Sequence, residues 1–209
     1  MDSLDMETGL GGEAVAVDQC HLDLVYGLVV SHKPKSILEL GVGSGRTTRT
    51  LIRAAEYNQN KPEITLVDSW TDFNGVVPKC IQNYRKFCNV VTSEEMNFVF
   101  SSKKTYDFIF SDADHWNTDK WFDYVYDRML NTEGILIYHD VSTGPLPNNE
   151  LRFPNLTNIL YRCKTRGISH VHLDKISRSD EKCYRGFLVI FKSQLQNVFA
   201  LGNQVGIHD

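Results

Sequence analysis

The stretch Ser36-Ile-Leu-Glu-Leu-Gly-Val-Gly-Ser-Gly45 decides the fold. A short apolar run leads into three glycines, and Arg46 then opens a segment with helical spacing. Glycine has no Cβ, so Gly41, Gly43 and Gly45 allow the chain to turn tightly and to approach a ligand closely. In open α/β sheets, ligands bind at the carboxyl ends of the strands. The stretch therefore predicts a strand, a ligand-binding turn and a helix.

Two phosphate-binding motifs come close to this pattern. A dinucleotide fingerprint needs a glycine where the chain has Arg46, and a P-loop needs a longer glycine spacing followed by Lys and then Ser or Thr. Acidic residues flank the turn instead, since Glu39 stands two positions before the first glycine and Asp68 ends the next apolar run. S-adenosylmethionine carries a sulfonium, an ammonium and only one carboxylate, so an acidic lining suits it. A carboxylate at Asp68 can also take both ribose hydroxyls, although either acid alone would more often be structural, as a solvated strand end, and only the two together with the glycines favour a cofactor site.

The glycine turn resembles the cofactor turn of class I S-adenosylmethionine-dependent methyltransferases. The two acids, Glu39 and Asp68, share in this resemblance, because they are separated by one strand–helix unit. The resemblance covers about residues 13–192. It implies a Rossmann-like, doubly wound α/β sheet of seven strands, mostly parallel with the last strand antiparallel, and helices on both faces. It also implies S-adenosyl-L-methionine as the cofactor, with these binding residues: Glu39, Gly41, Gly43, Ser44, Gly45, Asp68, Ser69, Trp70, Ser93, Glu94 and Asp112.

Strand and helix signals alternate along the chain, which indicates a parallel sheet with right-handed crossovers. The expected strands are 36–41, 63–68, 89–91, 106–112, 135–140, 169–173 and 187–192. The expected helices are 13–31, 46–57, 77–87, one that begins at 93 or 94, 117–130 and 156–165. Residues 1–12 are small and acidic and are predicted to be flexible, and 13–209 are predicted to form a single domain.

Composition limits the classes of partner. The chain has 209 residues, 42% of them hydrophobic and 23% charged, which is ordinary for a globular protein. A net charge of -4 and a pI near 6.0 give no global attraction to nucleic acid or to an anionic membrane. The partner we expect is a small-molecule acceptor, with neither nucleic acid nor a membrane. A homo-oligomer contact through the leading helix 13–31 is left open, because helices in that position either cover the cofactor or join subunits.

The cysteines and the first residues point to a cytoplasmic enzyme. The five cysteines are scattered and include no C-x-x-C pair, so they are expected to be free thiols in a reducing compartment. Met1-Asp-Ser-Leu-Asp5 lacks the basic and apolar blocks of a signal peptide, and no apolar run approaches the length of a membrane span.

Two further strand ends are rich in ligand-type side chains. They are Asp112-Ala-Asp-His-Trp116 and His139-Asp140, which together hold three carboxylates and two imidazoles. The carboxyl ends of parallel strands share one edge of a sheet, so we expect these groups to converge. Oxygen and imidazole donors suit Mg²⁺, Mn²⁺, Fe²⁺ or a similar divalent cation.

These strand ends resemble the metal sites of the catechol and caffeoyl-CoA type O-methyltransferases and of related antibiotic-pathway enzymes. The resemblance implies Asp112, His139 and Asp140 as metal ligands, with His139 standing where the catechol and caffeoyl-CoA families carry a carboxylate. A His-Asp pair at this place can equally orient the substrate without a metal. His115 stands where catechol-type enzymes carry a lysine base, and an imidazole with a near-neutral pKa can take a hydroxyl proton. Its alternative roles are to cap the next helix or to stack on Trp116.

The expected activity is O-methylation of a small hydroxylated molecule by direct displacement, with Asp112, His115 and His139 as catalytic residues. Two alternatives stay open at this point: an NAD-dependent oxidoreductase on a Rossmann sheet, and a non-catalytic S-adenosylmethionine-binding module. Aromatic side chains near the rim are expected to form a wall against a flat ligand (Trp70, Phe73 and Trp116), whereas Trp121 is expected to pack within a helix layer.

Overall fold

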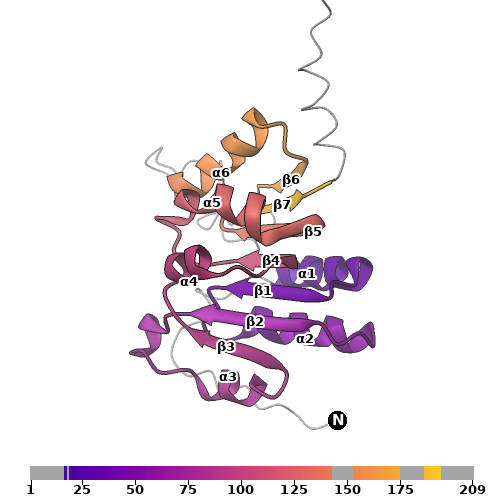
Figure 1. Cartoon of the computed structure of the whole chain (residues 1–209), viewed down its shortest axis with the longest axis vertical. Helices are drawn as coiled ribbons and strands as arrows, with labels where there is room; N and C mark the ends of the chain where they lie inside the picture. The colour runs from indigo at the N-terminus through magenta and orange to yellow at the C-terminus, as the bar shows by residue number, and fades with distance from the viewer. Residues whose placement is uncertain (1–16, 18, 143–152, 175–185, 194–209) are drawn as a thin grey trace, which may run out of the picture.

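The computed structural model describes residues 17, 19–142, 153–174 and 186–193. The segment 1–12, predicted to be flexible, lies outside these residues, and so does the start of the helix predicted over 13–31. Seven strands form one sheet in the order β3-β2-β1-β4-β5-β7-β6 (Figure 1). The strands are β1 (Ser36–Leu40), β2 (Glu63–Asp68), β3 (Cys88–Thr92), β4 (Tyr106–Ser111), β5 (Leu130–His139), β6 (His170–Leu173) and β7 (Phe187–Phe191).

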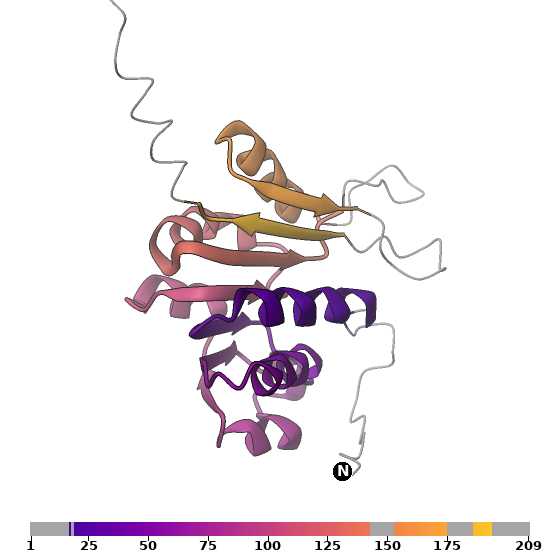
Figure 2. The same cartoon turned by 90° about the vertical axis from the view of Figure 1, so that its right-hand side faces the viewer.

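Strand direction matches the sequence prediction. The pairs from β3 to β5 are all parallel, whereas β7 is antiparallel to both β5 and β6. The last strand therefore enters the sheet between β5 and β6, with its direction reversed (Figure 2). Because the other strands run the same way, their carboxyl ends lie along one edge, which is the edge that carries the glycine turn.

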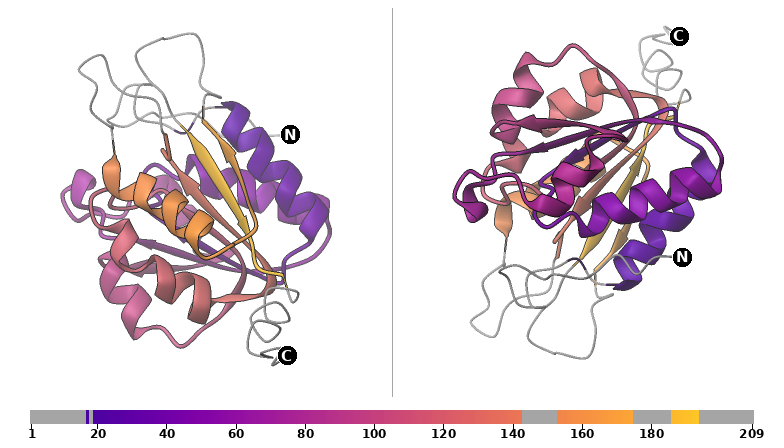
Figure 3. Two further views of the ribbon diagram at one scale, coloured as in Figure 1. Left: turned by 90° about the horizontal axis from the view of Figure 1, so that it is seen from above. Right: turned by 90° about the horizontal axis from the view of Figure 1, so that it is seen from below.

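Helices cover both faces of the sheet, as the alternation of strand residues requires. Ile37 packs on one face with α1 (Gln19–His32) and α2 (Arg46–Tyr57). Leu38, the next residue, packs on the opposite face with α4 (Glu95–Ser101) and α6 (Pro154–Thr165). Figure 3 shows α1 and α6 on opposite sides of the sheet. A sheet covered on both faces explains why its strands read as nearly continuous apolar runs.

The short elements fill the crossovers. A 3₁₀ turn η2 (Thr71–Phe73) and α3 (Lys79–Tyr84) connect β2 to β3.

No helix among the described residues is both long and apolar enough to cross a bilayer.

The helix predicted over 117–130 is wrong as a continuous helix. The segment divides into a 3₁₀ turn η3 (Thr118–Lys120), a short α5 (Phe122–Tyr124) and a π-helical turn η4 (Val125–Met129). Strand β5 then begins at Leu130, which pairs with Tyr106, rather than near residue 135. The side chain of Lys192 accounts for the way the segment ends. Its Nζ donates to the carbonyls of Tyr126 at 2.8 Å, Asp127 at 3.2 Å and Leu130 at 2.7 Å, and so satisfies acceptors that a regular helix end leaves exposed.

Candidate active site

The glycine turn follows β1 and brings the ends of β1 and β4 together. Gly41 has a φ of 78°, and a Cβ there would lie 2.4 Å from the backbone oxygen of Asp112. The amide of Asp112 donates to the carbonyl of Leu40 at 2.9 Å. Only glycine permits both the left-handed backbone and this close approach. Gly41 therefore allows the turn to lie directly against Asp112, the residue that follows β4.

Asp68 at the end of β2 holds the turn in place. Its Oδ2 accepts the amides of Val42 and Gly43, both at 2.8 Å, and its Oδ1 accepts the amide of Trp70 at 2.6 Å. Gly43 has a φ of 53°, and a Cβ there would meet no atom within 4 Å. The turn thus has an open side against which a ligand can lie. Ser44 is exposed and Ser69 is half-buried at the same edge.

Glu39 lies in the strand beneath the turn and is fully buried. Its Oε2 accepts the hydroxyl of Thr48 at 2.7 Å, while Oε1 has no hydrogen-bond partner among the described residues. Burial is the largest influence and raises the pKa of Glu39 to about 8, with smaller contributions from the charges of Asp68 and Asp112. A buried acid with an unsatisfied oxygen fits a nearby cationic ligand, because a positive charge would favour its ionised form.

A pocket of about 190 Å³ opens at the end of β3 and the start of α4. It is lined by Glu94, one of the predicted cofactor residues, and also by Glu95, Asp114 and Trp121. Ser93, whose amide donates to the carbonyl of Asp68 at 3.0 Å, connects this pocket to the glycine turn.

Glu95 was not among the residues that the sequence indicated. Its side chain is buried, and burial raises its pKa to about 7. Its place directly after Glu94 was the one signal for it, and the sequence does not show which of the two neighbouring acids turns inward.

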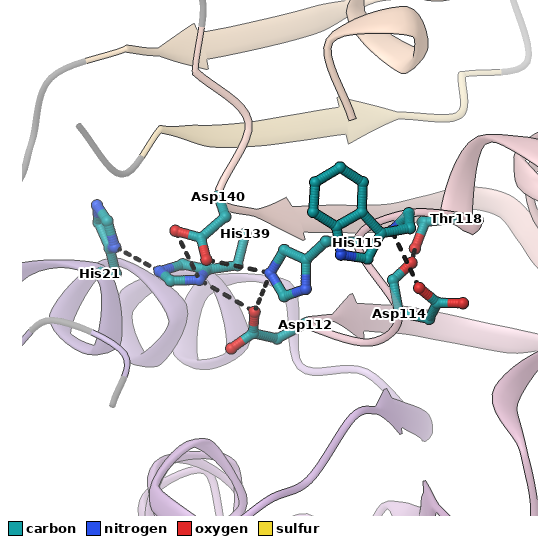
Figure 4. Close-up of polar contacts among 8 residues, drawn as sticks. His21, Asp112, Asp114, His115, Thr118, His139 and Asp140 are labelled. Atoms are coloured by element: carbon teal, nitrogen blue, oxygen red, sulfur yellow. Dashed lines mark hydrogen bonds and ion pairs between the residues drawn. The ribbon is translucent and has the colours of Figure 1, made fainter. Parts of the chain in front are cut away.

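Two imidazoles and two carboxylates form a compact group at the ends of β4 and β5, which we call the rim cluster: Asp112, His115, His139 and Asp140 (Figure 4). His115 Nε2 lies 3.1 Å from Asp140 Oδ2 and 3.3 Å from Asp112 Oδ1. His139 Nδ1 lies 3.1 Å from Asp112 Oδ1 and 3.6 Å from Asp140 Oδ1. The predicted convergence of these four side chains is confirmed.

The third carboxylate of the motif does not join the rim cluster. Asp114 is exposed and accepts the amide of Trp116 at 3.0 Å, and it also accepts the side chain of Asn117. Asp114 therefore stabilises the turn between β4 and η3 and takes no part in the rim cluster.

The electrostatics of the rim cluster contradict a near-neutral pKa for His115 in the protein alone. Burial opposes charge on His115, but the hydrogen bonds and negative charges of Asp112 and Asp140 outweigh it and raise the pKa to about 9. Burial likewise opposes ionisation of both aspartates. The two histidines outweigh burial at Asp112, and they do so at Asp140 as well, so the pKa of each carboxyl falls below its usual value. The cluster thus places two ionised carboxylates around the imidazolium of His115.

Asp112, His139 and Asp140 each present a ligand atom, and the three atoms lie within 4.8 Å of one another. This donor set, two carboxylates and one imidazole, has the chemistry that divalent cations select. The residues present therefore fit the divalent cation that the family resemblance implies, and His115 lies beside them.

His21 also reaches this group, from helix α1, and the sequence did not single it out. Its Nδ1 lies 3.0 Å from Nε2 of His139, and both side chains are buried. His21, Val25 and Val29 recur at every fourth position and are all buried. A histidine at an apolar position of this repeat was the one signal available.

The aromatic side chains lie differently from the predicted wall. Trp70 is fully buried, so its side chain lines no surface, and Trp121 packs in the core as expected. Trp116 is 60% exposed and meets Phe153 edge to face, with ring centroids 5.8 Å apart. Phe153 also contacts His115, with centroids 4.4 Å apart. The aromatic surface beside the rim cluster is therefore formed by Trp116 and Phe153. Phe73 is half-buried and packs on the face of the sheet that α1 and α2 cover.

Comparison with known proteins identifies the domain. Residues 38–141 match the family model described as a methyltransferase domain. This match spans the glycine turn and the rim cluster. None of the curated proteins matches the chain in sequence.

Solved structures share the fold at low sequence identity. An O-methyltransferase from Bacillus cereus, in complex with SAH, superposes with a TM-score of 0.67 at 20% identity, over 85% of this chain and 83% of that one. TomG from Streptomyces achromogenes, an O-methyltransferase of tomaymycin synthesis in complex with SAM, gives 0.66 at 12% identity, over 85% and 82%. The SAH-bound methyltransferase PaMTH1 from Podospora anserina gives 0.62 at 18% identity, over 84% and 79%.

These matches select among the three activities that the sequence left open. The domain and its structural neighbours are methyltransferases, so the nicotinamide-dependent oxidoreductase is set aside, and the chain is an enzyme rather than a binding module. The protein is a class I S-adenosylmethionine-dependent methyltransferase with the fold of the O-methyltransferases.

Proposed function

We propose that the enzyme transfers the methyl group of S-adenosylmethionine to a hydroxyl oxygen of a small acceptor, with the assistance of a divalent cation. The observation that carries this proposal is the rim cluster, where four ionisable side chains lie within 3.1–3.6 Å of their neighbours directly beside the glycine turn. Carboxylates and imidazoles gathered at a cofactor turn suit proton removal and cation binding better than simple solvation of a strand end.

Three residues would hold the cation: Asp112, His139 and Asp140. A bound divalent cation would supply Lewis acidity and lower the pKa of an acceptor hydroxyl. His115 has the position of a base, but it must be neutral to accept a proton, and in the protein alone the two carboxylates hold it in the imidazolium form. A cation bound by those carboxylates would compensate their charge and so weaken their stabilisation of the His115 imidazolium.

Each part of the cofactor site has a proposed role. The open side of Gly43 receives the amino-acid end of the cofactor, Asp68 at the end of β2 takes the ribose, and the pocket beside Glu94 and Glu95 takes the base. Transfer is then a direct displacement, in which the protein contributes mainly alignment and deprotonation.

The partner in this proposal is a small hydroxylated molecule. The net charge of -4 supports it, since a nucleic-acid or anionic-membrane partner would favour a basic chain. Trp116 and Phe153 support a flat acceptor, because together they give the rim an aromatic surface. We also propose a cytoplasmic location, supported by the free thiols of Cys80, Cys88 and Cys163.

Labelled S-adenosylmethionine and a catechol acceptor test this function, with Mn²⁺ or Mg²⁺ present and again with EDTA. We expect methyl transfer that requires the cation and that Asp112→Asn abolishes, while calorimetry still detects cofactor binding by this variant. Turnover that persists in Asp112→Asn would remove Asp112 from the chemistry. Transfer to amines and not to hydroxyls would overturn the choice of oxygen as the acceptor atom.

A further inference from the structure

A buried pair of histidines connects helix α1 to the rim cluster (Figure 4). Nδ1 of His21 lies 3.0 Å from Nε2 of His139, and the two rings meet edge to face, with centroids 5.0 Å apart and planes at 76°. His21 also stacks on Phe187 of β7, with centroids 5.0 Å apart and planes at 26°. The ring of His21 is therefore fixed from two sides, by His139 and by the last strand of the sheet.

The two nitrogens of His139 have different surroundings. Nε2 faces His21, whereas Nδ1 faces the carboxylates, at 3.1 Å from Asp112 Oδ1 and 3.6 Å from Asp140 Oδ1. A neutral imidazole carries a proton on one nitrogen and a lone pair on the other. Whichever nitrogen of His139 holds the proton, the partner of that nitrogen must accept it.

We propose that His21 is a positioning residue that holds His139 in the tautomer able to bind a divalent cation through Nδ1. In this arrangement Nε2–H of His139 donates to Nδ1 of His21, and the lone pair on Nδ1 of His139 points toward Asp112 and Asp140. Histidines that bind metals generally donate their other ring N–H to a nearby acceptor, which fixes the ring and strengthens the ligand. This inference rests on the proposed cation assistance and assigns a residue from helix α1 to it.

The proposal predicts a proton rearrangement within the pair. Without a cation, Nδ1–H of His139 donates to Asp112, and Nε2 of His139 accepts Nδ1–H of His21. With a cation on Nδ1 of His139, the proton of each ring moves to its Nε2. Each ring keeps one proton in both states, so the change is one of tautomer and not of charge.

Calorimetric titration with Mn²⁺ compares the wild-type protein with three variants. His21→Phe keeps a ring against Phe187 but removes the acceptor, and we expect it to weaken Mn²⁺ binding by about 10–100-fold. His21→Asn places an amide oxygen near the position of Nδ1, and we expect it to restore affinity to within about threefold of wild type. His32→Asn, in the last turn of the same helix, is the matched control and should leave affinity unchanged. Thermal midpoints in EDTA show whether each variant is folded.

Long-range ¹H–¹⁵N spectra of the wild-type imidazoles give a readout independent of activity and of any variant. In the Zn²⁺-loaded protein, His21 should carry its proton on Nε2 and His139 should be ligated through Nδ1. A proton on Nδ1 of His21 in that state would overturn the inference, even if His21→Phe did not fold. Equal Mn²⁺ affinity in wild type and folded His21→Phe would overturn it while the proposed function stands. A wild-type protein that binds no Mn²⁺ would remove the cation from the proposed function, and this inference with it.

Discussion

An alanine at Gly43 should separate ligand binding from folding. The residue has a φ of 53°, and a Cβ there would meet nothing within 4 Å, so the added methyl group clashes with no part of the protein. The left-handed backbone alone costs a non-glycine residue about 1–2 kcal/mol. The same methyl group, however, occupies the open side of the turn. We therefore expect Gly43→Ala to lower the affinity for S-adenosylmethionine at least about tenfold, or about 1.4 kcal/mol.

Two other glycines calibrate this expectation. Gly167, after α6, has a φ of 63° and equally open surroundings, so Gly167→Ala should carry the same backbone penalty and leave cofactor binding unchanged. Gly41→Ala adds a collision, since its Cβ would lie 2.4 Å from the oxygen of Asp112. Its loss of stability should reach about 2–5 kcal/mol, from backbone strain and overpacking together.

Urea denaturation and calorimetry with S-adenosylmethionine provide the two measurements. The reasoning predicts equal stability for Gly43→Ala and Gly167→Ala, with weakened cofactor binding in the first variant alone. Wild-type affinity in Gly43→Ala would refute a cofactor that lies against this turn. A stability loss in Gly43→Ala well above that of Gly167→Ala would refute the claim that a Cβ at Gly43 meets no other part of the protein.

Further predictions concern charge and structure. Glu39 has a pKa of about 8 in the folded protein against 4.5 in the reference state, so its stabilising effect is complete below pH 4.5 and is lost as pH rises toward 8. Urea unfolding at several pH values should show the stability of wild type relative to Glu39→Gln falling by up to about 1.4 kcal/mol per pH unit across this interval, and parallel profiles would contradict a protonated Glu39. Lys192→Met leaves three carbonyls without their shared donor, so unfolding free energy should fall by about 1–3 kcal/mol. A circular dichroism melt checks the Lys192 prediction, and an unchanged midpoint would mean that water replaces the ammonium group.

Local patterns predicted most of the sheet because they record which residues are buried. Helix α2 was predicted over its full range, 46–57, since glycine precedes it and its apolar residues repeat with helical spacing. The segment 117–130 shows the limit of this reasoning. Its apolar residues Phe122, Val125, Tyr126 and Met129 are buried as the pattern requires, but the carbonyls at its end are bound by Lys192, more than 60 residues away.

The same division holds for the candidate site. Asp112, His115, His139 and Asp140 could be brought together from the sequence because one topological rule places parallel strand ends on one edge. The contact of His21 with His139 could not be predicted in this way, since His21 comes from helix α1, which packs on one face of the sheet. The raised pKa of His115 also escaped prediction, because it depends on two carboxylates whose distances only the folded chain defines.

The position of β7 has a consequence for the order in which the protein becomes functional. This strand is the last described element of the chain, yet it lies between β5 and β6, and its Phe187 packs against both His21 and His139. During synthesis, the edge of β5 that pairs with β7 therefore stays unpaired until residues 187–191 have left the ribosome. A growing chain can form the cofactor turn early, but the ring of His21 gains its stacking partner Phe187 only when β7 inserts. Emerging chains should accordingly bind the cofactor before they reach full affinity for a metal.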